Sequence, residues 1–257
     1  MQNVKKYLII FVAIAFAIAV VAACVTLFSV KKVSAEFSVY GDSQAEEIQK
    51  DLDLFKGKNM IFLKKSDVYG ICDKYPYYEI TSVEKEYPNV LKVSVGKRVE
   101  TFTVAFGGKT YVLDGEGTVL NDVGETEFPQ NVVPIELGDL NVVNGDLGKK
   151  IATSDDGLFY SVIKTARAAG IIDVVKDIDL RLFFNGESYE GNAIFHTYTG
   201  VEIRIENIED DGENKIRAAF NKYETLSDYE KTTYKLIVTK NKTTGEIYAD
   251  WSEDSVI

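Results

Sequence analysis

Residues 7–30 form an apolar stretch of 24 positions without a charged side chain. A helix rises about 1.5 Å per residue, so this stretch is about 36 Å long and can cross a bilayer core of about 30 Å with some tilt. Lysine pairs lie on both sides of it, Lys5 with Lys6 and Lys31 with Lys32. The pattern predicts a transmembrane helix over residues 7–30 that follows a short head, residues 1–6.

A cleaved signal peptide and a lipoprotein signal are alternatives to an uncleaved anchor. A cleaved signal has an apolar region of about 7–15 residues and then a small-residue cleavage site. This stretch is longer, and bulky residues follow Ala22 and Ala23. Residues 21–24 loosely fit a lipidation box that ends in Cys24, but six more uncharged residues follow that cysteine. We therefore favour the uncleaved anchor.

The orientation of the anchor follows from the size of its two flanks. The lysine count is equal on both sides, and the free N-terminus adds one positive charge to the head. Large domains cross a membrane largely regardless of their charge. We expect residues 1–6 in the cytoplasm and the rest of the chain outside.

The pattern after the anchor predicts a small unit with the order strand, helix, helix, strand, strand, closing near residue 99. Ser43 and Glu46 have the spacing of a capping box for the first helix. The last two strands alternate and are joined at Pro88-Asn89, which is typical of a β-hairpin. The expected elements are a strand at 37–41, helices at 44–52 and 65–74, and strands at 78–87 and 90–99.

The rest of the chain is strand-rich, with Gly107-Gly108 as a strong hairpin signal. Two amphipathic helices are expected, one capped by Ser154 or Asp155 and ending at Gly170, and one over residues 213–223. Further strands are expected at 102–106, 109–113, 118–120, 177–184, 191–197, 201–206, 234–239 and 246–251. The fold class is α+β: one transmembrane helix, a small α+β domain and a larger β-rich domain with two helices.

Charge and cysteine content narrow the possible partners. The chain after Lys32 holds 25 basic and all 40 acidic residues, a formal net charge of −15. That field repels nucleic acids and other polyanions, so a protein partner is expected. Cys24 and Cys72 are the two cysteines, and Cys24 lies in the expected anchor, so the downstream part cannot form an internal disulfide. We expect Cys72 to be a small buried hydrophobic residue.

The sequence contains no motif for catalysis. His196 is the single histidine, and its alternating neighbours favour a position in a sheet. The chain has no Gly-x-Ser-x-Gly turn, no phosphate-binding loop and no Cys/His cluster for zinc. We expect no catalytic residue, no cofactor, no metal and no small-molecule substrate. The alternative is a membrane-anchored hydrolase of envelope glycan or peptidoglycan that uses a carboxylate pair, because such a pair is recognisable only in space.

Four short motifs follow one another between the anchor and residue 117. They are Phe37-x-Val39-x-Gly41 with Ser43 and Glu46-Glu47-Ile48, then Gly57-Lys-Asn59-Met-Ile-Phe-Leu63, then Val83-x-Lys85-x-Tyr87-Pro88-Asn89-Val90-Leu91-x-Val93-x-Val95, and Val112-Leu113-Asp114-Gly115-Glu116-Gly117. With the short head and the order of elements, they resemble the bacterial cell-division family FtsQ/DivIB. The resemblance covers about residues 5–120 well and the rest more loosely. A departure follows Val95, where the family commonly has Glu-Arg and then Pro, and this chain has Lys97-Arg98 and Glu100.

The resemblance implies a POTRA domain at residues 33–99 and a β domain at 100–257. It implies a non-enzymatic scaffold at the division septum, held in the cytoplasmic membrane, that binds FtsL and FtsB/DivIC-type membrane proteins and couples divisome assembly to septal wall synthesis. In such proteins the last strands of the β domain form the docking edge. The partner-binding residues expected here are Tyr234, Leu236, Val238, Glu246, Ile247, Tyr248 and Trp251. The alternative is that Trp251 fills the core and both strands are internal. A third possibility, a POTRA-bearing chaperone, is disfavoured because one such unit is present without a membrane barrel.

Overall fold

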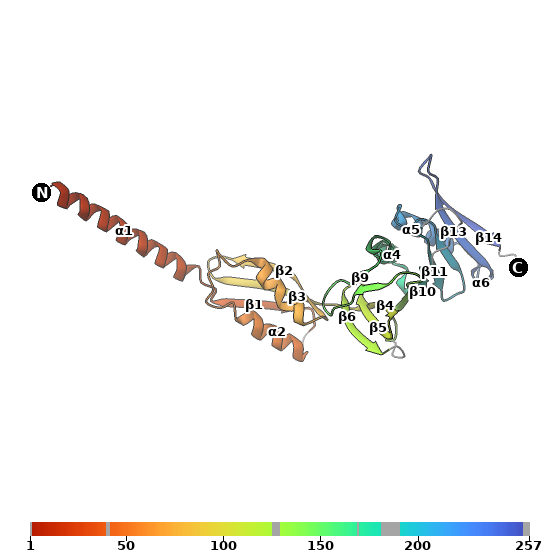
Figure 1. Cartoon of the computed structure of the whole chain (residues 1–257), viewed down its shortest axis with the longest axis horizontal. Helices are drawn as coiled ribbons and strands as arrows, with labels where there is room; N and C mark the ends of the chain where they lie inside the picture. Colours follow the sequence, from red (N-terminus) through yellow and green to blue (C-terminus); the bar gives the residue numbers. More distant parts are fainter. Residues whose placement is uncertain (1, 40–41, 125–128, 169, 181–190, 254–257) are drawn as a thin grey trace. The chain divides into compact units, whose positions relative to one another are not determined.

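The computed structural model describes residues 2–39, 42–124, 129–168, 170–180 and 191–253. The chain divides into two compact units, Met1–Arg98 and Val99–Ile257. Both combine helices with sheets, as Figure 1 shows, so the predicted α+β class with an N-terminal apolar helix is confirmed.

The first unit contains one long helix, two short helical segments with a 3₁₀ turn, and three strands. In chain order its elements are α1 (Gln2–Leu27), β1 (Lys32–Phe37), α2 (Ser43–Asp53), α3 (Lys65–Tyr69), the 3₁₀ helix η1 (Gly70–Lys74), β2 (Tyr78–Glu86) and β3 (Val90–Lys97).

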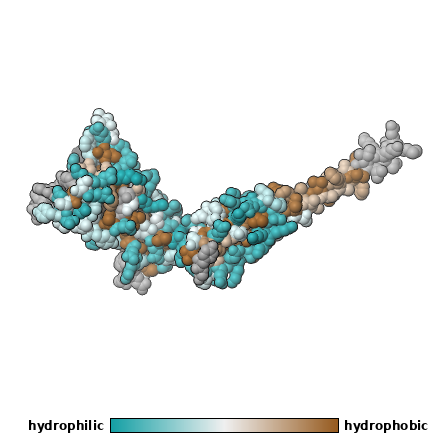
Figure 2. Space-filling view, turned by 180° about the vertical axis from the view of Figure 1, so that it is seen from behind, coloured by the Kyte–Doolittle hydropathy of each residue, from teal (hydrophilic) through white to brown (hydrophobic). Residues whose placement is uncertain are grey.

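Helix α1 is exposed along its described length, and the window Ile10–Leu27 is long and apolar enough to cross a membrane. Figure 2 shows hydrophobic side chains on the described part of α1, in contrast to the largely hydrophilic surface elsewhere. The side chains of Phe11 and Phe16 are 70% and 71% exposed. In water such a helix would leave a large apolar area unburied, which is what a lipid environment removes.

The remainder of the first unit is a three-stranded sheet in the order β1-β3-β2. Strand β1 runs parallel to β3, with Lys32 opposite Val90, and β2 forms an antiparallel hairpin with β3. Helix α2 places Ala45, Ile48 and Leu52 on one buried face, as their spacing predicts. The Ile48 and Leu52 side chains join a core that also includes Val68, Cys72, Tyr78, Leu91, Val93 and Val95.

Four expectations for this unit are wrong in detail. Helix α1 ends at Leu27 and not at residue 30, because the Val30 side chain is buried in the core of the first unit. The cap of α2 is Asp42 and not Ser43, since the Asp42 carboxylate accepts the Gln44 N–H bond at 3.0 Å. The expected helix over residues 65–74 changes to a 3₁₀ helix at Gly70. The expected strand at 37–41 lies earlier, as β1, and residues 40–41 fall outside the described part.

The second unit contains eleven strands, three helices and one 3₁₀ turn among its described residues. They are β4 (Glu100–Phe106), β5 (Lys109–Asp114), β6 (Val119–Gly124), β7 (Val133–Glu136), β8 (Val142–Asn144), β9 (Ala152–Thr153), α4 (Asp156–Ala168), η2 (Ile171–Asp173), β10 (Val175–Asp179), β11 (Ala193–Thr197), β12 (Glu202–Ile205), α5 (Gly212–Glu224), α6 (Glu230–Thr233), β13 (Tyr234–Lys240) and β14 (Ile247–Glu253).

Nine of these strands form one sheet in the order β14-β13-β12-β11-β10-β7-β4-β5-β6. Helix α5 packs on β12, β13 and β14, and α4 packs on α5. The core between helices and sheet contains Phe159, Phe195, Ile203, Leu236 and Val238, all without solvent exposure. Because successive residues of a strand face opposite sides, the intervening positions of β10–β14 form a second face, which we call the open face. The predicted strand over 177–184 ends at Asp179, and residues 181–184 fall outside the described part.

Candidate functional site

Strand β14 is the terminal strand of the nine-stranded sheet. It pairs antiparallel with β13, with Leu236 opposite Trp251 and Val238 opposite Ala249. The turn before it is fixed by Asn241, whose side-chain oxygen accepts N–H bonds from Thr243 at 2.8 Å and Thr244 at 3.1 Å. Within the described residues no strand pairs with the other side of β14, so its outer backbone groups face away from the sheet.

The side chains of β14 alternate between the two faces of the sheet. Ile247 and Ala249 pack against the core that α5 covers. Tyr248 and Asp250 are exposed on the open face, and the Tyr248 side chain is 42% exposed. The Tyr248 hydroxyl donates a hydrogen bond to Glu246 Oε2 at 2.6 Å, which fixes the ring along the strand. Sequence reasoning missed Asp250, although its alternation with Tyr248 was a signal that could have found it.

The expectation that β13 is also an edge strand is wrong. Strand β13 lies between β12 and β14, and Leu236 and Val238 are fully buried against the core. Their alternation indicated one buried face, but it did not show that a neighbour lies on each side of the strand. The side chains of Tyr234 and Trp251 lie outside the described residues. The expected role of Trp251 therefore stays a prediction.

His196 lies in β11 on the open face, half-buried between neighbouring strands. Its Nδ1 atom contacts the Asp177 carboxylate of β10, and its Nε2 atom lies 3.8 Å from Glu202 Oε1 of β12. Glu202 in turn pairs with Lys235 of β13 at 3.0 Å. Polar side chains of four neighbouring strands thus meet on this face, and such cross-strand pairs stabilise a sheet. The predicted position of His196 in a sheet is confirmed.

The pKa values of six described carboxyl groups are shifted in the direction opposite to that of a glycosidase's general acid. A general acid of a glycosidase requires a raised pKa. Each of the six has a lowered pKa, because a hydroxyl, lysine or backbone donor stabilises its charged form; these groups are Asp42, Asp51, Asp53, Glu116, Asp210 and Glu230. The described residues also contain no group of three or more His, Cys, Asp or Glu side chains that could hold a metal ion.

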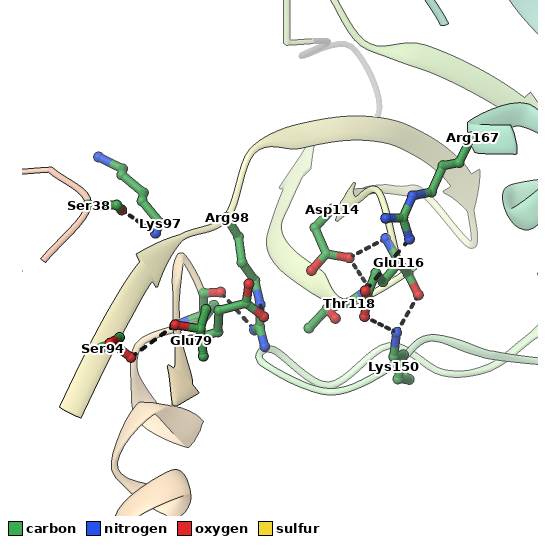
Figure 3. A network of polar contacts seen from close by, with 12 residues as sticks. Ser38, Glu79, Ser94, Lys97, Arg98, Asp114, Glu116, Thr118, Lys150 and Arg167 are labelled. Atoms are coloured by element: carbon green, nitrogen blue, oxygen red, sulfur yellow. Dashed lines mark hydrogen bonds and ion pairs between the residues drawn. The ribbon is translucent and has the colours of Figure 1, made fainter. Parts of the chain in front are cut away.

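The motif over residues 112–117 forms a tight polar turn, shown in Figure 3. Asp114 Oδ1 accepts backbone N–H bonds from Glu116 and Thr118, both at 2.8 Å. The Glu116 carboxylate lies 3.2 Å from the Lys150 ammonium and 3.6 Å from Arg167. A pocket of about 440 Å³ lies beside these residues, and its basic groups are engaged by acidic groups of the chain itself. This motif therefore closes the turn and connects it to α4.

Two other predicted features have structural roles. The Cys72 side chain is buried, and burial raises the pKa of its thiol to about 11. A thiol in that state is unreactive, so the prediction of a buried hydrophobic residue is confirmed. Lys97 and Arg98, where the chain departs from the family pattern, lie at the end of the β2–β3 hairpin. The Lys97 N–H donates to Ser38 Oγ at 3.0 Å, and Arg98 pairs with Glu79 at 3.5 Å, as Figure 3 shows.

The chain has a similar solved structure among known proteins. No family model matches the chain, and no curated protein matches it. The chain is similar to the major extracytoplasmic domain of the trans isomer of the bacterial cell-division protein DivIB from Geobacillus stearothermophilus. The match has 12% identity and a TM-score of 0.30, and it covers 51% of this chain and 98% of that one. It comes from the family that the sequence motifs resemble. At this TM-score the match does not bear on function. The function is inferred from the sequence and structure of this chain.

Proposed function

We propose that the protein is a membrane-anchored, non-enzymatic cell-division scaffold of the FtsQ/DivIB type. The observation that carries the proposal is the outer edge of β14 at the end of the large sheet, which pairs with no strand of the described residues. The four sequence motifs and the order of elements in the first unit support the same family. In this proposal α1 holds the chain in the cytoplasmic membrane, residues 1–6 lie in the cytoplasm, and both units work outside it at the septum.

The partners in this proposal are single-span division proteins of the FtsL and FtsB/DivIC type. A segment of one partner adds as a strand to β14, so that its backbone bonds with the unpaired N–H and C=O groups of the edge. Tyr248 and Asp250 then contact alternate side chains of the added strand and set its register. Because Glu246 and Asp250 are acidic, a partner strand with basic residues at those positions complements this edge.

The proposal is tested with the Tyr248→Lys variant of the full chain in nanodiscs, titrated with the FtsL and FtsB/DivIC-type pair of the same organism. Tyrosine at an interface centre contributes about 2 kcal/mol or more, so the affinity is expected to fall by about 30-fold or more. The matched control is Tyr198→Lys, which changes an exposed tyrosine in the turn between β11 and β12 and is expected to bind normally.

Equal affinity of both variants would contradict the docking edge, and circular dichroism of each variant checks that the fold is retained. A fluorescent fusion of the intact chain tests the wider role. It is expected to concentrate at the septum of dividing cells, and an even distribution around the envelope throughout division counts against a division scaffold.

A further inference from the structure

The chain leaves α1 through a short connection that two loops of the first unit enclose. Phe28 lies directly after α1, and its ring contacts Tyr87 edge to face with the ring centres 5.9 Å apart. The Phe28 carbonyl accepts the Met60 N–H bond at 2.6 Å, and Val30 N–H donates to the Lys58 carbonyl at 2.9 Å. We call residues 28–32, 53–65 and 86–89 the anchor end of the unit. An extended chain spans at most about 3.6 Å per residue, so residue 31 lies within about 14 Å of the end of α1.

The anchor end exposes large apolar side chains. Their exposed fractions are 70% for Leu54, 48% for Ile61, 78% for Phe62 and 57% for Tyr87. The same loop buries its other apolar residues, Phe55, Met60 and Leu63, in the core of the unit. The sequence motif over residues 57–63 therefore contains two kinds of apolar position, and the folding of the unit uses only one of them.

The exposed positions belong to an ordered loop. Asn59 Oδ1 accepts the Ile61 N–H bond at 2.9 Å, and the Asn59 carbonyl accepts that of Leu63 at 3.0 Å. The Lys85 ammonium donates to the Leu63 carbonyl at 2.6 Å. Phe62 is therefore held outward between two fixed residues, and an exposed large apolar residue that the fold holds in place indicates a contact surface.

The charge of the anchor end is opposite to that of the rest of the chain. It contains six lysines, Lys31, Lys32, Lys56, Lys58, Lys64 and Lys65, against the acidic residues Asp53 and Glu86, a net charge of +4. The chain after Lys32 as a whole has a net charge of −15. Basic residues next to a membrane span are attracted to anionic headgroups.

We propose that the anchor end lies in the headgroup region of the bilayer, with Leu54, Ile61 and Phe62 at the boundary with the acyl chains. Tyr87 and Phe28 occupy the level where aromatic rings are enriched, and the lysines contact anionic lipid phosphates. The occupant is a lipid surface because the patch is continuous with α1, and a bilayer that α1 crosses is always present there. The contact rests on the proposed role of α1 as an anchor, and it fixes how the first unit sits on the membrane.

The test places single tryptophans in the full chain in nanodiscs of phosphatidylglycerol and phosphatidylcholine. The native Trp251 is changed to Phe, and Phe62→Trp reports on the anchor end. We expect blue-shifted emission from this variant and loss of that emission when the lipids carry brominated acyl chains. Val39→Trp is the matched control: its position is exposed and lies seven residues from Lys32, beyond the other end of β1, about 23 Å away along an extended chain. Its emission is expected to stay red-shifted and unquenched.

Phe16→Trp in α1 separates failure of this inference from failure of the anchor. Quenching at position 16 together with unquenched emission at position 62 overturns the lipid contact and leaves the anchor intact; a protein partner for Phe62 is then the remaining occupant. Unquenched emission at position 16 overturns the anchor and with it this inference. If position 62 is quenched, Lys64→Glu with Lys65→Glu is expected to reduce that quenching in phosphatidylglycerol nanodiscs, and undiminished quenching overturns the role of the lysines.

Discussion

Particular phenylalanine and lysine side chains of the two units lie in opposite environments. The first unit exposes Phe62 and keeps its lysines at the surface, where Lys74 and Lys97 pair with Asp51 and Asp42. The second unit buries Phe195 completely and encloses the Lys215 ammonium. The chemical type of a side chain therefore does not fix its contribution to stability. Burial decides that contribution, because a buried group gives up its contacts with water on folding and an exposed group keeps them.

This difference separates side chains that stabilise the fold from side chains that are available for contact. Where a large side chain is buried, its removal is expected to lower stability, and where a rigid backbone holds it in solvent, its removal is expected to affect binding instead. Paired substitutions, one at a buried and one at an exposed position or one at each of two similar contacts, can break or sharpen this contrast.

The largest effect is expected from phenylalanine removal. Phe195→Ala in β11 leaves a cavity in the core of the second unit and is expected to lower the free energy of unfolding by about 3–5 kcal/mol. Phe62→Ala is expected to change it by less than about 0.5 kcal/mol, since the side chain is mostly exposed. Urea unfolding of the full chain in detergent micelles, followed by near-ultraviolet circular dichroism, measures both. A large loss of stability in Phe62→Ala would show that this ring serves folding.

The next effect is expected at the buried lysine of the second unit. The Lys215 ammonium donates to the carbonyls of Glu206 at 2.8 Å and Asn207 at 2.9 Å, and burial lowers its pKa. Lys215→Met leaves both carbonyls without that donor and is expected to cost about 1–3 kcal/mol. Lys164→Met removes an exposed pair with Glu213 and is expected to cost less than about 1 kcal/mol. The same unfolding measurement ranks the two, and equal costs would contradict the importance of burial.

Sequence patterns gave most of the fold because they report local periodicity. The buried faces of α2 and α5, the hairpin of β2 and β3, and the glycine turn between β4 and β5 were all predictable from spacing. The neighbours of a strand were not, since Leu236 and Val238 have the same pattern at an edge or in the middle of a sheet. The outward position of Phe62 was not predictable either, because Asn59 turns the backbone after Met60 within an apolar run.

The smallest effect is expected in the surface cluster of the first unit. The Tyr78 hydroxyl donates to Asp42 Oδ2 at 2.5 Å and is the main cause that lowers the Asp42 pKa from 3.8 to about 2; the Gln44 N–H and Lys97 add to it. Because the folded-state pKa lies below the unfolded value, this stabilisation is present above about pH 3.8 and is lost as the pH falls through about 2. Tyr78→Phe is expected to raise the Asp42 pKa towards 3.8 and so to weaken the loss of stability in acid.

Carboxyl ¹³C NMR of the aspartate-labelled chain measures this pKa, and Tyr75→Phe is the matched control. Tyr75 donates to Asp51 at 2.8 Å, but the Lys74 ammonium is the larger cause that lowers the Asp51 pKa. The Asp51 pKa is therefore expected to rise less in Tyr75→Phe than the Asp42 pKa rises in Tyr78→Phe, and the Asp42 pKa is expected to stay unchanged. An unchanged Asp42 pKa in Tyr78→Phe would mean that the Gln44 N–H and Lys97 suffice. The hydroxyl of this buried ring would then contribute through the packing of β2 against α2 and not through charge.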